Sequence, residues 1–445
     1  MSEFLDIDSL KPEYRGLEWQ NIELPTEVKT WIPRGNLQLQ ADLQTVSRFD
    51  VSGKQHCQWR WPKRDICVFT DLHADADAFI SSLVASGCAA KTGAMDSDLK
   101  LTKQGKNALL IINGDCFDKG PSNLRLLRMI KQVKTLGARL KIIAGNHDIR
   151  FLAGIRSLDN HDNPLLSHFF IRMAPKGITF LKEIYANYLA HLAPKKRSAY
   201  GENLSAQQVR DRLYPAADWE QLFPGQAAAV MNDYSIGKEV AKIRNKQRAF
   251  EALCLDHGLT LSMAYAAVNK WRELFLDKKG EFAWFFRDMK LLHVEASFLF
   301  AHAGVDDIIA RQLRKKGTKY LNKCFHKSLK TDLFKLYYSP LGNVFRSKYR
   351  EGDWQFTGKG AAELNAINIQ AIVHGHVNHH RGQEMFVRHG IVNFECDASL
   401  DYATRRKEGL EGRGAAATLI KKEGCIFGVS VDYPYIKAFT PEHLL

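Results

Sequence analysis

Five short motifs rich in carboxylates, imidazoles and glycine occur in a fixed order along the chain. They are Asp71-Leu72-His73, Gly114-Asp115-Cys116-Phe117-Asp118, Gly145-Asn146-His147-Asp148, His302-Ala303-Gly304 and His374-Gly375-His376. Their oxygen and imidazole ligands suit divalent manganese, iron and zinc alike. Each motif follows an apolar run, and a pair of metal ions needs ligands gathered from several strand ends at once. The order of the motifs therefore predicts a site for two metal ions.

The first two motifs contain ligands that can act together on neighbouring ions. Asp71 and His73 stand two residues apart at a strand end, so both side chains can reach one ion. Asp115 follows Gly114, which allows a sharp turn, and the two oxygens of its carboxylate can bridge two cations. We therefore interpret Asp115 as a ligand shared by both ions.

The second and third motifs also contain groups suited to proton transfer and phosphate binding. Asp118 lies too close in sequence to Asp115 to be needed on the same ion, so we expect it to orient a histidine. Lys119 offers a positive charge to a phosphate oxygen. Asn146 can bind a metal through its amide oxygen, whereas His147 is free to handle protons. An Asp118–His147 pair would be a general acid whose imidazolium is held by a carboxylate.

Histidines supply the last two motifs. His302 follows an apolar run and is predicted as a ligand. Of His374 and His376, we expect His376 to be the metal ligand. His374 would either contact a ligand without binding the metal or be the alternative ligand. His379 and His380 are further candidates that fit better as loop residues.

The motifs lie in a pattern of alternating strands and helices. Apolar runs predict buried strands over residues 66–70, 108–113, 140–144, 298–301 and 371–373. Helical periodicity predicts helices over residues 75–90 and 122–136. Ligands at the carboxyl ends of such strands are typical of an α/β protein. Later runs predict strands of a second sheet packed on the first, at residues 390–394, 415–421 and 425–431. We therefore expect an α/β fold of two sheets with helices outside.

The length of 445 residues exceeds what one core usually spans. Residues 1–64, which contain several prolines, are predicted to form an N-terminal extension. Residues 65–150 plus 291–445 are the expected catalytic domain. Residues 151–290 show helical periodicity and few strand signals, so we predict a large helical insertion. This insertion is either a cap that selects substrates or a buttress remote from the site.

Composition limits the class of protein. A net charge of +14 and a pI near 9.3 favour anionic partners, although a solvated basic surface explains them equally well. No apolar run reaches the roughly 18 residues of a membrane span, and the acidic N-terminus lacks a signal-peptide core. The eight cysteines are scattered without a CxxC pair. We expect a cytoplasmic protein without a membrane partner.

The motifs DLH, GDCFDKG, GNHD, HAG and HGH together resemble those of the calcineurin-like metallophosphoesterases. GDCFDKGP and GNHD are most similar to the phosphoprotein phosphatase branch, which includes bacterial serine/threonine phosphatases and diadenosine tetraphosphatases. The resemblance covers about residues 65–150 and 295–380. It implies a two-sheet β-sandwich flanked by helices, with two divalent or mixed-valence ions of manganese, iron or zinc.

The resemblance also implies a role for each site residue. The first metal would be held by Asp71, His73 and Asp115. The second would be held by Asp115, Asn146, His302 and His376. His147, oriented by Asp118, would protonate the leaving group.

Three features depart from the family pattern. The first motif continues with Ala74 instead of glycine. The second has Lys119 where the branch usually carries arginine, and an ammonium cannot form the bidentate fork of a guanidinium. We expect Arg150 or Arg381 to share phosphate binding with Lys119. The third departure is the long insertion, which makes transfer of a substrate from the branch unsafe.

We expect a phosphoesterase in which a metal-bridging hydroxide attacks phosphorus, with Lys119 and Arg150 on the phosphate. The first hypothesis is a phosphomonoesterase, similar to serine/threonine phosphatases, acting on phosphorylated protein or a small phosphorylated molecule. The alternative is a nucleotide or dinucleoside-polyphosphate hydrolase or a phosphodiesterase, which the basic charge favours slightly. A third hypothesis is an inactive fold used as a binding module, but every expected ligand is present. No motif for RNA or DNA binding supports a nucleic-acid partner.

Overall fold

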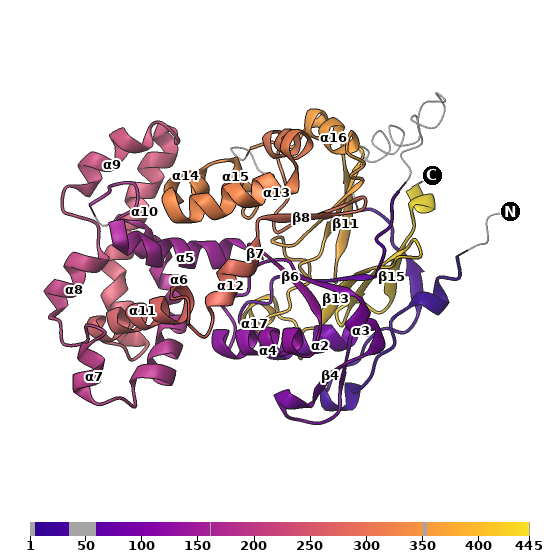
Figure 1. The fold of residues 1–445 in the computed structure, drawn as a ribbon, viewed down its shortest axis with the longest axis horizontal. Helices are drawn as coiled ribbons and strands as arrows, with labels where there is room; N and C mark the ends of the chain where they lie inside the picture. Colours follow the sequence, from indigo (N-terminus) through magenta and orange to yellow (C-terminus); the bar gives the residue numbers. More distant parts are fainter. Residues whose placement is uncertain (1–4, 35–58, 161, 350–353, 445) are drawn as a thin grey trace.

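Two β-sheets pack face to face at the centre of the molecule, and helices cover them on the outside (Figure 1). This computed structural model describes residues 5–34, 59–160, 162–349 and 354–444. The predicted α/β fold of two sheets flanked by helices is confirmed.

The strands divide into a larger and a smaller sheet. The larger contains β1 (Val28–Thr30), β2 (Ile66–Phe69), β5 (Leu109–Ile112), β6 (Arg139–Ile143), β7 (Met289–Lys290), β13 (Ala416–Ile420), β14 (Ile426–Ser430) and β15 (Ile436–Phe439). The smaller contains β8 (Leu292–Glu295), β9 (Phe298–Ala301), β10 (Ala371–His374), β11 (Glu384–Arg388) and β12 (Ile391–Glu395). Their orders are β1-β15-β14-β13-β2-β5-β6-β7 and β11-β12-β10-β9-β8. A separate pair consists of β3 (Ala89–Lys91) and β4 (Leu99–Leu101).

The central strands are buried on both faces, and successive side chains enter different cores. In β5, Leu109 and Ile111 pack between the two sheets, whereas Leu110 and Ile112 pack against the helices. β2 alternates in the same way. A strand that is covered on both faces needs apolar residues at every position, which explains the sequences ICVF of β2 and LLII of β5.

Helices connect the strands and cover the outer faces. Those before the predicted insertion are α2 (Ala76–Ala85), α3 (Lys103–Asn107), α4 (Asn123–Thr135) and α5 (Asn146–Ser157). Those after it are α13 (Asp307–Thr331), α14 (Leu333–Tyr338), α15 (Pro340–Asn343), α16 (Gly358–Asn365) and α17 (Tyr402–Glu408). Among the described residues, none of the helices is long and apolar enough to cross a membrane.

The predicted insertion is helical in the structure. It contains α6 (Phe169–Ile184), α7 (Pro194–Ser198), α8 (Ala206–Leu213), α9 (Trp219–Ala227), α10 (Asp233–Asp256), α11 (Leu261–Leu276) and α12 (Ala283–Asp288). Helices α7 to α11 gather at the end of the molecule opposite both termini (Figure 1). The division of the chain at residues 64, 150 and 290 stays a prediction.

The assignment of the C-terminal strands was wrong in one respect. Residues 415–421 and 425–431 were expected in the second sheet, but β13 pairs antiparallel with β2 of the larger sheet, and β14 pairs with β13. Only the run at 390–394 joins the smaller sheet, as β12. An apolar run shows that a strand is buried, but not which edge it hydrogen-bonds, and the edge of β2 opposite β5 needed a partner.

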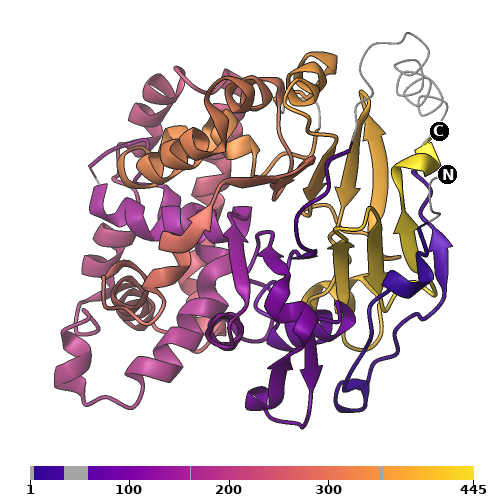
Figure 2. The same cartoon turned by 45° about the vertical axis from the view of Figure 1, so that its right-hand side comes forward.

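The described part of the predicted N-terminal extension is integrated into the sandwich. β1 pairs in parallel with β15, and the two lie side by side at the edge of the larger sheet (Figure 2). Trp31, just after β1, is buried between the sheets with its ring 5.3 Å from that of Phe394. Residues 35–58 of the extension lie outside the described residues.

Asn113, the residue after β5, joins the two sheets. Its buried amide nitrogen donates to the carbonyls of Ala301 at the end of β9 and Val373 in β10, both at 3.1 Å. Its own backbone carbonyl lies 2.8 Å from Nδ1 of His302. These bonds are directional and run between the sheets, so they set the relative position of three strand ends.

We predict that Asn113→Ala lowers the free energy of unfolding by about 3 kcal/mol, because two buried carbonyls lose their donor. Urea unfolding of the purified proteins measures this change. Asn245→Ala, at an exposed position on α10, is the matched control and should change stability by less than about 0.5 kcal/mol. Equal unfolding midpoints for the two variants would refute the role of Asn113.

Candidate metal centre

The five motifs come together at one edge of the sandwich. β2, β5 and β6 run parallel in the larger sheet, and β9 and β10 run parallel in the smaller sheet. Each motif begins at the carboxyl end of one of these strands. The structure therefore brings the predicted site residues of all five motifs to the same place.

Asp115 lies at the centre of this arrangement. Its Oδ2 is 3.4 Å from Nε2 of His302, 3.8 Å from Nε2 of His73 and 3.9 Å from Nε2 of His147. Two groups of potential ligand atoms form around it, each within 4.8 Å: one contains His73 and His147, the other His302 and His376. Asp115 belongs to both groups, which is the position expected of a shared ligand.

Asp71 also lies beside these side chains, in contact with His73 and His376. Its Oδ1 is 3.8 Å from Nε2 of His73. Its Oδ2 accepts hydrogen bonds from Thr70 Oγ1 at 2.5 Å and from the backbone N–H of His376 at 3.0 Å. The compact group around His73 thus contains His147 in the place where the sequence suggested Asp71.

Backbone carbonyls orient two of the histidines. Nδ1 of His73 lies 3.1 Å from the carbonyl of Phe117, and Nδ1 of His302 lies 2.8 Å from that of Asn113. An Nδ1–H that donates to a carbonyl leaves Nε2 unprotonated, and both Nε2 atoms face Asp115. This is the tautomer in which an imidazole binds a metal.

The amide of Asn146 lies between Arg150 and the group of potential ligands that contains His302 and His376. One end of the amide lies 2.9 Å from Nδ1 of His376, 3.1 Å from Oδ2 of Asp115 and 3.2 Å from Nε2 of His302. The other end lies 2.9 Å from Nη2 of Arg150. With the oxygen towards Arg150, that oxygen accepts from the guanidinium, and the two amide N–H groups can donate to Asp115 and to one of the imidazoles. With the oxygen towards Asp115, it joins a carboxylate and two imidazoles as a fourth ligand of a cation.

The charges at the centre favour a cation. Burial raises the pKa of Asp71, and the neighbouring Asp115 carboxylate raises it further. Burial alone would lower the pKa of His302, but the carboxylates of Asp115 and Asp71 raise it to about 10. A protonated imidazole therefore balances two buried carboxylates, and a divalent ion would balance them better. In addition, Nε2 of His376 is buried without a partner in the described part of the chain. The donor set thus fits metal ions.

The proposed acid and phosphate-binding groups border the centre. Nδ1 of His147 lies 3.0 Å from Oδ2 of Asp118. Burial lowers the pKa of His147, while the carboxylates of Asp115 and Asp118 oppose this effect. Nζ of Lys119 lies 2.7 Å from Nε2 of His73, so its ammonium reaches the centre directly.

Much of the site has left-handed backbone conformation. Six predicted site residues have positive φ, from 41° to 77°: Asp71, His73, Asp115, Asp118, Lys119 and His376. Such conformations are strained for residues with a side chain and concentrate at functional sites. Ala74 has a φ of 59°, which explains why the family pattern has glycine there.

Sequence reasoning missed two residues that shape the site. Asn113 was assigned only to a strand, although it links the sheets and orients His302. Asp148, the last residue of the third motif, is fully buried and accepts from the backbone N–H groups of Cys116, Phe117 and Gly145 at 3.0 to 3.2 Å. The carboxylate ties the second motif to the third. The position of Asp148 in the Gly145-Asn146-His147-Asp148 motif was the feature of the sequence that could have identified it.

The other histidine candidates lie apart from the centre. Nε2 of His374 faces Glu395 at 3.8 Å, and Nε2 of His379 lies 2.8 Å from the same carboxylate. His380 pairs with Glu408 at 3.3 Å.

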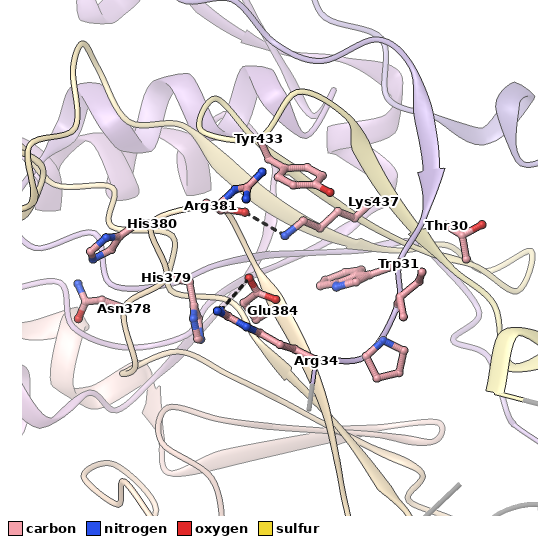
Figure 3. Close-up of a pocket in the computed structure, with 12 residues that line it drawn as sticks. Thr30, Trp31, Arg34, Asn378, His379, His380, Arg381, Glu384, Tyr433 and Lys437 are labelled. Atoms are coloured by element: carbon pink, nitrogen blue, oxygen red, sulfur yellow. Dashed lines mark hydrogen bonds and ion pairs between the residues drawn. The ribbon is translucent and has the colours of Figure 1, made fainter. Parts of the chain in front are cut away.

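Arg381 also lies elsewhere, in a cavity of about 690 Å³ (Figure 3). This cavity is lined on other sides by Trp31, Tyr433 and Lys437. It includes the further candidates His379 and His380 but none of the expected metal ligands and neither Asp118 nor His147. Between the two arginines suggested for phosphate binding, Arg150 is the one beside the metal ligands.

The predicted insertion packs directly behind the second motif. The ring of Phe117 lies 5.0 Å from that of Phe285 and 5.1 Å from that of Phe180. It also contacts Phe275 and Phe286 edge-on. The insertion is therefore in contact with the loop that carries Asp115 and Asp118.

Comparisons with known proteins give one family match and several structural similarities. The model of the calcineurin-like phosphoesterase family matches residues 65–221. No curated protein matches the chain. One similar solved structure is the cold-active protein-tyrosine phosphatase of a psychrophilic Shewanella species, with 12% sequence identity and a TM-score of 0.41, covering 84% of this chain and 80% of that chain. Another is a protein serine/threonine phosphatase from Saccharomyces cerevisiae with similarity to human phosphatase PP5, with 9% identity and a TM-score of 0.34, covering 91% and 89%. The family match identifies a calcineurin-like phosphoesterase domain at residues 65–221, and such a domain supports a phosphoric ester hydrolase.

Proposed function

We propose that this protein is a phosphomonoesterase that uses two divalent metal ions. The observation that carries the proposal is the position of Asp115, whose Oδ2 is shared by two groups of imidazole ligands. A shared carboxylate is what a pair of adjacent cations requires.

The first ion would be held by Asp71, His73 and Asp115. The second would be held by Asp115, Asn146, His302 and His376. When bound, ions of manganese, iron or zinc supply Lewis acidity towards the phosphoryl oxygens and make water nucleophilic near neutral pH.

The remaining groups bind the phosphate and supply the proton. Lys119, with its ammonium at the centre, and Arg150, beside Asn146, would neutralise the phosphoryl oxygens. His147 would donate a proton from Nε2 to the departing oxygen, while Asp118 at Nδ1 holds the ring and stabilises its protonated form. The buried position of His147 keeps that proton from bulk water.

We further propose that the helical insertion caps the site. Its aromatic rings contact Phe117, and its helix α6 carries cations towards Arg150, so it can restrict which substrates reach the metals.

We predict that Asp115→Asn lowers turnover of p-nitrophenyl phosphate by about a thousandfold, because an amide cannot provide a negatively charged bridge between two cations. Metal-stripped protein reconstituted with Mn²⁺ is assayed, and bound metal is measured by elemental analysis.

Asp211→Asn, at an exposed carboxylate on α8, is the matched control and should retain both turnover and metal. Full activity and full metal content in Asp115→Asn would contradict the shared-ligand assignment.

We predict that Asp118→Asn slows hydrolysis of phenyl phosphate by about a hundredfold but that of p-nitrophenyl phosphate much less. Phenolate is the poorer leaving group and depends more on a proton from His147. The kcat values of the two substrates are compared in wild type and variant.

His147→Asn should show the same difference between substrates. An equal loss on both substrates would show that Asp118 supports the structure of the site and not proton transfer.

A further inference from the structure

Two helices of the predicted insertion place cations beside the metal centre. Arg172 and Lys176 stand one turn apart on α6, and Lys242 and Lys246 stand one turn apart on α10. Residues four apart on a helix share a face. Helices α6 and α10 pack against each other at the end of the molecule that also contains α14 (Figure 1).

Specific contacts hold these side chains together. Nζ of Lys246 donates to the backbone carbonyl of Arg172. Nε of Arg172 donates to the buried carboxylate of Glu239. The Arg172 guanidinium lies 4.5 Å from the ring centre of Tyr337, the last but one residue of α14, and Arg346 lies 5.0 Å from the same ring.

Positive charge in this cluster exceeds negative charge. Glu239 pairs with Arg172, but no carboxylate among the described residues forms an ion pair with Arg150, Lys242, Lys246 or Arg346. The Nε atoms of Arg150 and Arg346 are buried without a hydrogen-bond partner in the described part of the chain. Buried donors without acceptors are unfavourable, and a bound anion would supply the acceptors.

The titration of neighbouring groups reflects the same excess. Burial lowers the pKa of Lys246 to about 7, and the charges of Lys242, Arg172 and Arg150 contribute. Burial alone would raise the pKa of Tyr337, but Arg172, Arg150 and Arg346 lower it to about 6.

Arg150 connects this cluster to the metal centre. Its Nη2 is 2.9 Å from the amide of Asn146, and its charge acts on Lys242 and Lys246. Burial lowers the pKa of Lys176, and the charges of Arg150, Asp118 and Lys119 act on it as well. Cations of the insertion thus lie within electrostatic reach of residues of the metal centre.

We propose that this cluster is a second anion site, which binds a further phosphate group of a small bisphosphorylated substrate while the metal centre holds the phosphate to be cleaved. The proposal rests on the proposed function and narrows its substrate class. A phosphate offers several acceptor oxygens and about two negative charges, which match the unpaired donors and the excess of positive charge. Arginine and lysine side chains on facing helices can bind this phosphate group without contacting the rest of the substrate.

The test compares fructose 1,6-bisphosphate with fructose 6-phosphate, which differ by one phosphate. Wild type should show a kcat/KM at least about tenfold higher for the bisphosphate, because charge-assisted hydrogen bonds are individually worth this much. In the Lys242→Gln/Lys246→Gln double variant this ratio should fall towards one. Arg248→Gln, at an exposed position on the opposite face of the same helix, should keep the wild-type ratio.

Calorimetry on metal-free protein provides a readout that does not depend on turnover. The double variant should bind fructose 1,6-bisphosphate about tenfold more weakly than wild type and Arg248→Gln do. Equal affinities in all three proteins, or the same kcat/KM ratio in wild type and double variant, would overturn the anion site. Loss of hydrolysis of every substrate with every metal would instead refute the proposed function, and calorimetry would still decide whether the cluster binds the second phosphate.

Discussion

The geometry of the candidate metal centre depends on the hydrogen bonds by which Asn113 joins the two sheets. Hydrophobic contact between sheets is strong but non-directional, so by itself it does not set how far one sheet slides over the other. The amide of Asn113 donates to one strand end and to the strand beside it in the opposite sheet, and its carbonyl orients His302. One buried side chain thus decides the distance between ligands that are almost two hundred residues apart in the chain.

Around this link the protein holds arrangements that are unfavourable on their own. Two buried carboxylates lie close to the same histidine, and several loop residues adopt left-handed backbone conformations, each costing about 1–3 kcal/mol. Packing on both sides keeps them in place: Asp148 binds three backbone N–H groups of the loops, and Phe117 is enclosed by aromatic rings of the insertion. Apolar residues of the predicted insertion therefore pack against the loop that carries Asp115 and Asp118. Its basic residues lie beside the candidate site.

Much of the fold could be predicted because buried parallel strands leave a plain pattern. The strand predicted at 298–301 coincides with β9, and those predicted near residues 66, 109 and 140 coincide with β2, β5 and β6 within a residue or two. The failure at β13 and β14 has a physical cause. Their apolar sequences would fit a buried strand of either sheet. Burial requires apolar residues, whereas backbone hydrogen bonding to a particular neighbouring strand requires no particular residue type.

By itself the sequence determined the types of ligand, their order and their places at strand ends, because metal chemistry restricts which side chains serve and turns require particular residues. Only the tertiary structure decided which ligands meet. It grouped His147 with His73 and Asp115, turned His374 towards Glu395, and put Arg381 in a separate cavity. It also brought Arg172 and Lys246, more than seventy residues apart, to the side of Arg150. These outcomes depend on distances across sheets and between helices, which no local pattern of residues encodes.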